Sequence, residues 1–120
     1  MDEHKLAREK RQRAAKLRLG SENPACAVCG CTDWECLEAH HIAGRAFDPT
    51  TTILCRNHHR ILSDRQKDHP SQMNSPSTFE ENLAHFLLGM AALFELLVRS
   101  LREFADKIFE KQQASEEPES

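Results

Sequence analysis

The chain has 120 residues, of which 39% are hydrophobic and 29% are charged, and its formal net charge is -3. This length allows one or two small units. The composition is polar for a globular protein, and a unit the size of residues 24–70 is near the limit at which a hydrophobic core alone can hold a fold. A bound metal ion is the expected staple.

The cysteine content bears on the redox compartment. Five cysteines are an odd number, and the N-terminus is basic and polar, without the apolar segment and cleavage site of a secretion signal. Disulfides are therefore not expected. Metal-bound thiolates in a reducing cytoplasm fit better, and we expect a cytoplasmic protein.

The N-terminal arm, residues 1–23, is strongly basic. Residues 2–19 predict a helix, because they are good helix formers that end at Gly20. Lysine and arginine dominate between residues 4 and 18, where Glu9 is the single acid. Two interpretations stay open: a solvated charged helix, or an arm that neutralises nucleic-acid backbone.

Two metal-type pairs follow. Cys26-x-x-Cys29 and Cys55-x-x-His58 have the ligand spacing of a tetrahedral zinc site, and together they supply the four ligands that a structural zinc needs.

Three residues between the two pairs have less certain roles. Cys31 and Cys36 could compete for the metal, because they form a local cluster with the first cysteine pair. We expect Cys36 instead to pack as a small apolar residue, and Trp34 to lie in the core under the metal-binding turn.

The segment 24–68 predicts a ββα unit. Residues 34–42 alternate apolar and polar side chains, which indicates a strand. Residues 44–49 form a loop, residues 50–54 a short β-branched strand, and residues 56–66 a helix. The predicted fold class is a small metal-stapled α+β domain, flanked by the basic helix and a long C-terminal helix.

Residues 69–77 form a linker, and residues 78–111 predict a long amphipathic helix. Its apolar residues recur mostly in alternating steps of four and three, at Leu83, Phe86, Met90, Leu93, Leu97, Leu101, Phe104 and Ile108. An apolar stripe of this width, if exposed to solvent, is typical of an interaction surface. We expect homo-oligomers through this helix, or packing of the N-terminal helix onto part of it.

A membrane partner is not expected, because the apolar run 83–98 is shorter than the roughly 20 residues of a span and contains His85 and Glu95. The polar, acidic tail, residues 112–120, is expected to be disordered.

His40, His41 and His59 remain outside the metal quartet. Adjacent strand residues point to opposite faces, so the first two histidines do different jobs. One can coordinate a divalent metal with His59, and the metal can stabilise a leaving oxyanion. The other imidazole can accept a proton from water. This set predicts hydrolysis of a nucleic-acid strand.

The motif Cys26-x-x-Cys29, Glu38-Ala39-His40-His41-Ile42, Leu54-Cys55-x-x-His58-His59 resembles the HNH endonuclease family, which has a zinc-bound ββα-metal, or treble-clef, fold. The resemblance covers roughly residues 24–68. It implies that His41 is the general base and that His40 and His59 hold Mg²⁺ or another divalent metal. It also implies a structural zinc on the Cys/His quartet, and a prokaryotic or phage source.

The chain departs from this family at two points. The family usually has cysteine where this chain has His58, and histidine is an acceptable zinc ligand. The central asparagine, expected near Thr50 or Thr51, is absent; Thr50, Thr51 or Asp48 could replace it. A non-catalytic zinc module that binds nucleic acid or protein is therefore the alternative function.

DNA is the expected partner. Arg45, Arg56 and Arg60 could contact its phosphates, although each could equally lie on a solvated face.

Overall fold

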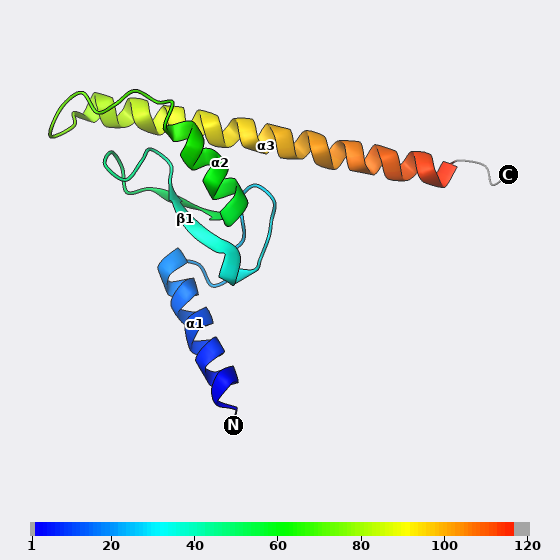
Figure 1. Ribbon diagram of the computed structural model, residues 1–120. Helices are drawn as coiled ribbons and strands as arrows, with labels where there is room; N and C mark the ends of the chain where they lie inside the picture. Colours follow the sequence, from blue (N-terminus) through cyan, green and yellow to red (C-terminus); the bar gives the residue numbers. More distant parts are fainter. Residues whose placement is uncertain (1, 117–120) are drawn as a thin grey trace.

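The computed structural model describes residues 2–116 (Figure 1). The elements in chain order are α1 (Glu3–Leu19), the 3-10 turn η1 (Trp34–Cys36), β1 (Leu37–His41), β2 (Thr51–Cys55), α2 (Arg56–Gln66) and α3 (Phe79–Glu116). The protein is thus small and α+β, with a two-stranded sheet and three helices, and the coarse fold class is confirmed.

The two strands form an antiparallel hairpin, in which Leu37 pairs with Cys55 and His41 pairs with Thr51. The first strand is shorter than the predicted 34–42. The reason is local: the Asp33 carboxylate accepts a hydrogen bond from the Glu35 N–H, which starts a 3-10 turn before the strand. The helix predicted over residues 56–66 has those bounds in the structure.

The hydrophobic core lies where the hairpin, α2 and α3 meet. Leu37, Leu54, Leu62 and Leu96 are its largest fully buried side chains, each at most 1% exposed. Each such residue contributes roughly 1.5–3 kcal/mol of hydrophobic burial, which is little in total for a folded unit. The core therefore agrees with the expectation that a metal ion completes the stability of this domain.

The first half of α3 sits directly on the loop end of the hairpin. Gly89 is essential there, because a Cβ at this position would overlap the carbonyl oxygen of Ile42. One turn earlier, the buried ring of His85 stacks on Phe47 from the hairpin loop, with ring centroids 3.7 Å apart. These contacts bring α3 against the end of β1.

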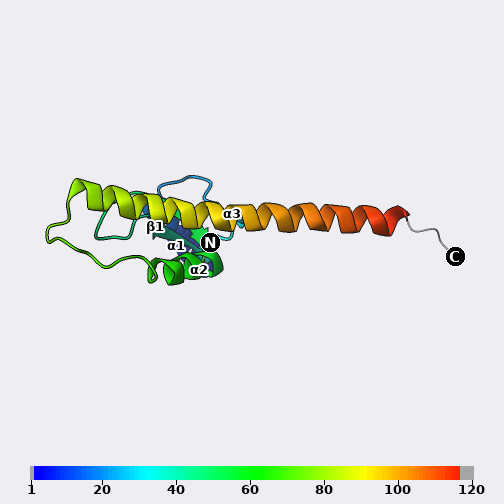
Figure 2. The same ribbon diagram turned by 90° about the horizontal axis from the view of Figure 1, so that it is seen from above.

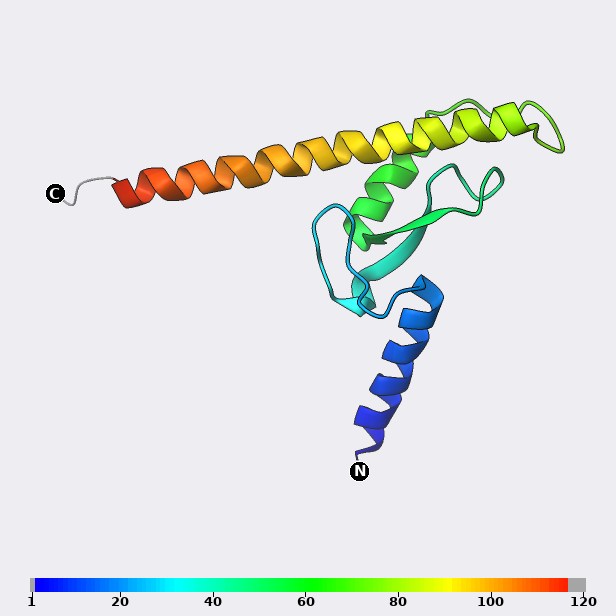
Figure 3. The same ribbon diagram turned by 180° about the vertical axis from the view of Figure 1, so that it is seen from behind.

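The N-terminal helix begins and ends with ordinary caps. Asp2 accepts from the His4 N–H at 2.9 Å, and Gly20 adopts φ 72°, a left-handed conformation suited to glycine. Its buried residues Ala15 and Leu19 face the central module. Figures 1 and 3 show α1 and α3 on opposite sides of that module. The predicted alternative, in which the N-terminal helix covers the apolar stripe of α3, is therefore wrong.

The second half of α3 projects away from the rest of the chain (Figure 2). Residues 101–115 are all exposed. The helix continues past the predicted end at Lys111 to Glu116, because these residues are good helix formers without Gly or Pro. The rest of the tail predicted to be disordered, 117–120, lies outside the described residues. By length and composition alone, α3 is long and apolar enough to cross a membrane.

Candidate metal centre

Three thiols and one imidazole come together where the hairpin meets α2. Cys26, Cys29, Cys55 and His58 place their ligand atoms within 4.8 Å of one another, so this cluster could hold a metal ion. The first two lie in a turn that the Ala27 N–H ties to β2 by donating to the Ile53 carbonyl at 2.9 Å. The other two lie at the end of β2 and in the first turn of α2.

The interatomic distances suit a tetrahedral zinc. Zinc–sulfur bonds of about 2.3 Å and zinc–nitrogen bonds of about 2.0 Å imply sulfur–sulfur separations near 3.8 Å and sulfur–nitrogen separations near 3.5 Å. The Sγ atoms of Cys29 and Cys55 are 3.8 Å apart. His58 Nδ1 lies 3.6 Å from Cys26 Sγ and 3.3 Å from Cys55 Sγ. The four residues are therefore compatible with a structural zinc site.

The two thiols of the turn titrate in opposite directions. Burial raises the pKa of Cys26, but the N–H groups of Cys29, Cys55 and Val28, together with His58, lower it to about 6. Burial and the neighbouring thiols of Cys26 and Cys55 raise the pKa of Cys29 to about 11. Once one thiolate forms, its neighbour resists ionisation, and a bound dication would remove that repulsion.

The structure decides between the two possible ligand sets. Among residues 2–116, Cys31 and Cys36 do not join the cluster. The Cys36 thiol lies 3.7 Å from Asp33 Oδ2, and the negative charge of Asp33 raises its pKa. Cys31 supplies a carbonyl oxygen that accepts from the Cys26 N–H at 2.9 Å, so it shapes the turn through its backbone.

The three remaining histidines lie outside this cluster. His40 and His41 are the last two residues of β1, and His59 follows the ligand His58 in α2. His40 is buried and His41 is half-buried, as expected for adjacent strand residues that point to opposite faces. The rings of His40 and His59 meet edge to face, with centroids 5.3 Å apart. The structure therefore brings the two predicted metal-binding imidazoles together and turns His41 away.

Glu38 belongs to the sequence motif, but the motif alone assigns it no role. Its Oε2 lies 2.5 Å from His59 Nδ1, and its Oε1 lies 3.4 Å from Arg56 Nε. The hydrogen bond with His59 lowers the pKa of Glu38. Burial opposes this shift, and the charge of His59 and the contact with Arg56 add to it. A carboxylate on Nδ1 fixes the ring and leaves Nε2 for a ligand. Its place two residues before His40 on the same strand face was the available signal.

His40 is held by its surroundings as a neutral ring. Burial, followed by the nearby His59 and His41, lowers its pKa to about 4. Its Nε2 lies 3.3 Å from the Gln66 amide nitrogen, which also donates to the carbonyls of His41 and Ile42 at 2.8 and 3.1 Å. Gln66 thus anchors the end of β1. A neutral imidazole is the form that binds a metal, and Gln66 faces one of its two nitrogens.

The hairpin loop and the start of β2 contain Asp48, Thr50 and Thr51, the residues near which the family resemblance predicts an asparagine. Thr51 lies directly across the sheet from His41. The Asp48 carboxylate accepts from the Thr50 N–H at 2.8 Å, and these hydrogen bonds with Thr50 lower the pKa of Asp48. The Thr50 carbonyl in turn accepts from the Ile42 N–H at 3.2 Å. Asp48 therefore shapes the turn before β2, and the backbone bond between Ile42 and Thr50 closes the loop.

Arg45, Arg56 and Arg60 are all exposed. Arg45 lies in the hairpin loop, and Arg60 follows His59 in α2. Arg56 differs, because it pairs with the carboxylate that holds His59.

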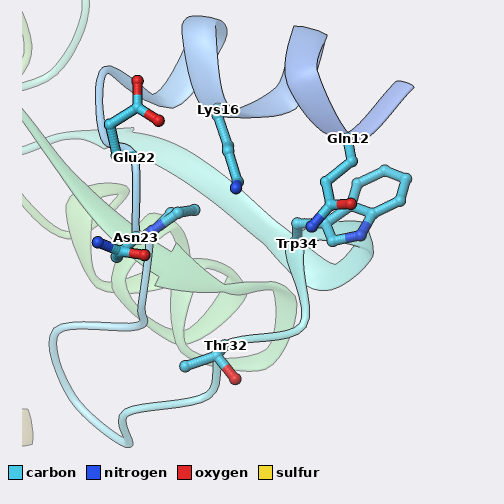
Figure 4. A pocket seen from close by; sticks show the side chains of 7 residues that line it. Gln12, Lys16, Glu22, Asn23, Thr32 and Trp34 are labelled. Atoms are coloured by element: carbon cyan, nitrogen blue, oxygen red, sulfur yellow. The ribbon is translucent and has the colours of Figure 1, made fainter. Parts of the chain in front are cut away.

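A hollow of about 180 Å³ lies away from the metal centre, between α1 and the turn before β1 (Figure 4). Its lining includes Gln12 and Lys16 from α1, and Trp34. Trp34 is half-buried at this rim, so the expectation that it forms part of the core is wrong. The hollow is lined by no cysteine or histidine, and it offers no metal-binding chemistry.

The fold and this cluster define a small α+β protein with a Cys₃His site compatible with zinc. No family model, curated protein or solved structure matches the chain.

Proposed function

We propose that this chain is a metal-dependent endonuclease of the HNH type, built on a zinc-bound treble-clef unit, that hydrolyses DNA phosphodiester bonds. Zinc sits on Cys26, Cys29, Cys55 and His58. A second divalent metal, Mg²⁺ or a similar ion, is held by His40 and His59. His41 is the general base.

The observation that carries this proposal is the Glu38–His59 pair beside His40. A metal-binding histidine usually donates its other ring N–H to a carboxylate or carbonyl, which orients the ring and raises its basicity. Glu38 occupies that position at His59 Nδ1, 2.5 Å away. A binding module has no need of an imidazole oriented in this way next to a second, neutral imidazole.

The protein residues divide the chemistry among them. His41 accepts the proton of the attacking water, because a neutral imidazole can act as a general base. His59 and His40 would hold the divalent metal, which would supply charge neutralisation at the phosphate and the leaving oxygen. Gln66 holds the end of β1, and with it His40 and His41, by donating to the carbonyls of His41 and Ile42.

Arginines around the site supply DNA affinity in this proposal. Arg45 and Arg60 are exposed near the histidines in the chain, and the basic face of α1 adds further positive charge. Contacts of this kind to phosphates carry little sequence information. We therefore expect binding that weakens steeply with salt and cleavage with little sequence preference.

The test is the nicking of supercoiled plasmid by zinc-loaded protein with Mg²⁺, Mn²⁺ or Ni²⁺ added, and with chelator. Wild-type protein should nick only with metal, and His41→Ala should lower the rate by at least about 100-fold. His4→Ala is the matched control, because His4 lies exposed in α1 and should leave the rate unchanged. Intact plasmid in every metal, with folded protein, rules the nuclease out.

The alternative is a non-catalytic zinc module that binds nucleic acid. Two observations favour it: Thr51 stands across from His41 where the family has asparagine nearby, and Gln66 faces His40 Nε2. It predicts salt-dependent DNA binding without nicking, and no effect of His41→Ala on affinity.

A further inference from the structure

Helix α3 has two different faces. One face packs on the zinc module through small or buried residues, and these are His85, Gly89, Ala92, Leu93, Leu96 and Ser100. The other face is apolar and largely open to solvent.

The open face follows a strict heptad pattern. Its residues alternate in steps of four and three without interruption: Leu83, Leu87, Met90, Phe94, Leu97, Leu101, Phe104 and Ile108. We call these eight residues the seam. A spacing of 3.5 residues is the pattern of helices that pair along their length, whereas a single face on a globular core needs only the 3.6-residue period. At 1.5 Å per residue the seam is about 38 Å long.

The chain itself covers only part of the seam, because Met90 and Leu97 are half-buried against the core and the other six seam residues are exposed. Leu101 is 67% exposed, Phe104 50% and Ile108 61%, although all three are large and apolar. Among residues 2–116, no other element packs on this part of the helix. Helices of this length are marginal in water without a packing partner. The distal half of α3 therefore requires a partner with a matching apolar stripe.

Charges at the two ends of the seam select the partner and its direction. The next positions of the heptad pattern are Glu80 before Leu83 and Lys111 after Ile108. In a parallel pair of identical helices, Glu80 would face Glu80 and Lys111 would face Lys111. In an antiparallel pair, each Glu80 meets Lys111 of the other copy, so both ends are attractive.

The same antiparallel arrangement matches every seam residue. With the two-fold axis between Glu95 and Leu96, the facing pairs are Leu83 with Ile108, Leu87 with Phe104, Met90 with Leu101, and Phe94 with Leu97. The distal half of each α3, which has no packing partner within residues 2–116 of its own chain, then packs against the proximal half of α3 in the other copy. Each zinc module stays on residues 85–100 of its own α3, on a helix face that contains none of the seam residues.

We propose that α3 forms an antiparallel two-helix coiled coil with a second copy of this chain, which makes the protein a homodimer in which each zinc module keeps its place on the α3 face outside the seam. This dimer does not depend on nuclease activity.

The first test compares two exposed apolar residues of the distal half. Leu101→Glu puts a charge into the seam, while Phe109→Glu puts the same charge just outside it, at a residue that is 64% exposed. Sedimentation equilibrium should show a dimer for wild type and Phe109→Glu. Leu101→Glu should raise the dissociation constant by at least about 100-fold, because each dimer buries two such charges. A monomeric or tetrameric wild type overturns the proposal.

A membrane partner gives the opposite result in the same experiment. Wild-type protein would be monomeric without lipid and would bind vesicles of phosphatidylcholine and phosphatidylglycerol. Leu101→Glu and Phe109→Glu would then weaken vesicle binding to a similar degree. This outcome overturns the dimer.

The second test is a charge exchange at the ends of the seam. Glu80→Lys alone and Lys111→Glu alone should each weaken the dimer about fivefold to tenfold, because each makes two repulsive contacts per dimer. The double variant Glu80→Lys/Lys111→Glu should return to within about twofold of wild type. If the charges act only on the dipole of their own helix, the double variant is worse than either single one, and the antiparallel register is wrong.

Discussion

The two clusters at the junction of β2 and α2 use neighbouring residues in different ways. His58 joins the Cys₃His cluster, while His59, the next residue, joins His40 and Glu38. The first cluster has four ligand atoms at zinc-like separations. The second has two imidazoles, each touched by a polar side chain, and further positions would fall to water or substrate. We call the first cluster closed, because four protein ligands are typical of a structural metal site. We call the second open, because free coordination positions are typical of a catalytic metal site.

Consecutive helix residues point in directions 100° apart, so one helical turn contributes a residue to each cluster. In the proposed function, a zinc ion on the first cluster would fix the first turn of α2 and, with it, the position of His59. Breaking the closed cluster should therefore destroy both functions, whereas breaking the open one should spare the fold.

The largest expected effect comes from Cys55→Ser, which removes a ligand from the closed cluster. A structural zinc contributes on the order of 10 kcal/mol, which is comparable to the whole stability of a small domain. The variant should lose bound zinc and its cooperative unfolding transition. Zinc content by a colorimetric chelator assay and thermal unfolding by circular dichroism measure both.

Cys36→Ser is the matched control for this experiment, because Cys36 lies outside the cluster on η1. It should retain one zinc and shift Tm by no more than about 3 °C. A zinc-free Cys55→Ser protein that unfolds cooperatively near the wild-type Tm would show that the metal is dispensable.

The next effect concerns pH and the open cluster. The pKa of His40 falls from 6.5 to about 4 on folding, because burial and the other histidines oppose its charge. Between these pH values the unfolded chain binds a proton at His40 that the folded chain does not. The free energy of unfolding should therefore drop as pH falls from 6.5 to 4, by up to about 3 kcal/mol.

His40→Gln isolates this contribution. Acid also releases zinc in both proteins, so the informative quantity is the difference between the two pH curves, measured by urea unfolding at constant excess zinc. Wild type should lose more stability than the variant below pH 6.5. If the pH curves of wild type and variant are parallel, His40 has the same pKa in the folded and the unfolded protein.

Much of the closed cluster could be predicted from the sequence, because its ligands come in two short-range pairs whose spacing already fits a metal. The helix over residues 56–66 was predictable for a similar reason, since the metal ligands mark its first turn. The strand start was not, because the Asp33–Glu35 hydrogen bond and a 3-10 turn override the alternating pattern.

The environment of the open cluster depends on contacts between distant segments. The pairing of Glu38 with His59 requires the hairpin register, which sets Glu38 opposite Leu54. The burial of His40 accompanies the close approach of α3, which only Gly89 allows at Ile42. Periodicity shows that α3 is amphipathic, but it does not show which of its two faces meets the module.

The smallest effect that still separates the clusters comes from Glu38→Gln. The neutral amide keeps the size of the side chain but removes the charge that orients His59, so zinc content and Tm should stay close to wild type. Metal-dependent nicking, or Mn²⁺ affinity by calorimetry, should fall about tenfold.

Arg56→Gln is the control for this experiment, because it changes the other partner of the Glu38 carboxylate. Arg56 lies 3.4 Å from the same carboxylate, but its side chain is 71% exposed, and an exposed ion pair contributes little. Its effect on Mn²⁺ affinity should be below about threefold. If Arg56→Gln and Glu38→Gln have equal and opposite effects on Mn²⁺ affinity, Glu38 acts through its charge at a distance. If only Glu38→Gln lowers it, the hydrogen bond to His59 is what prepares the imidazole for a metal.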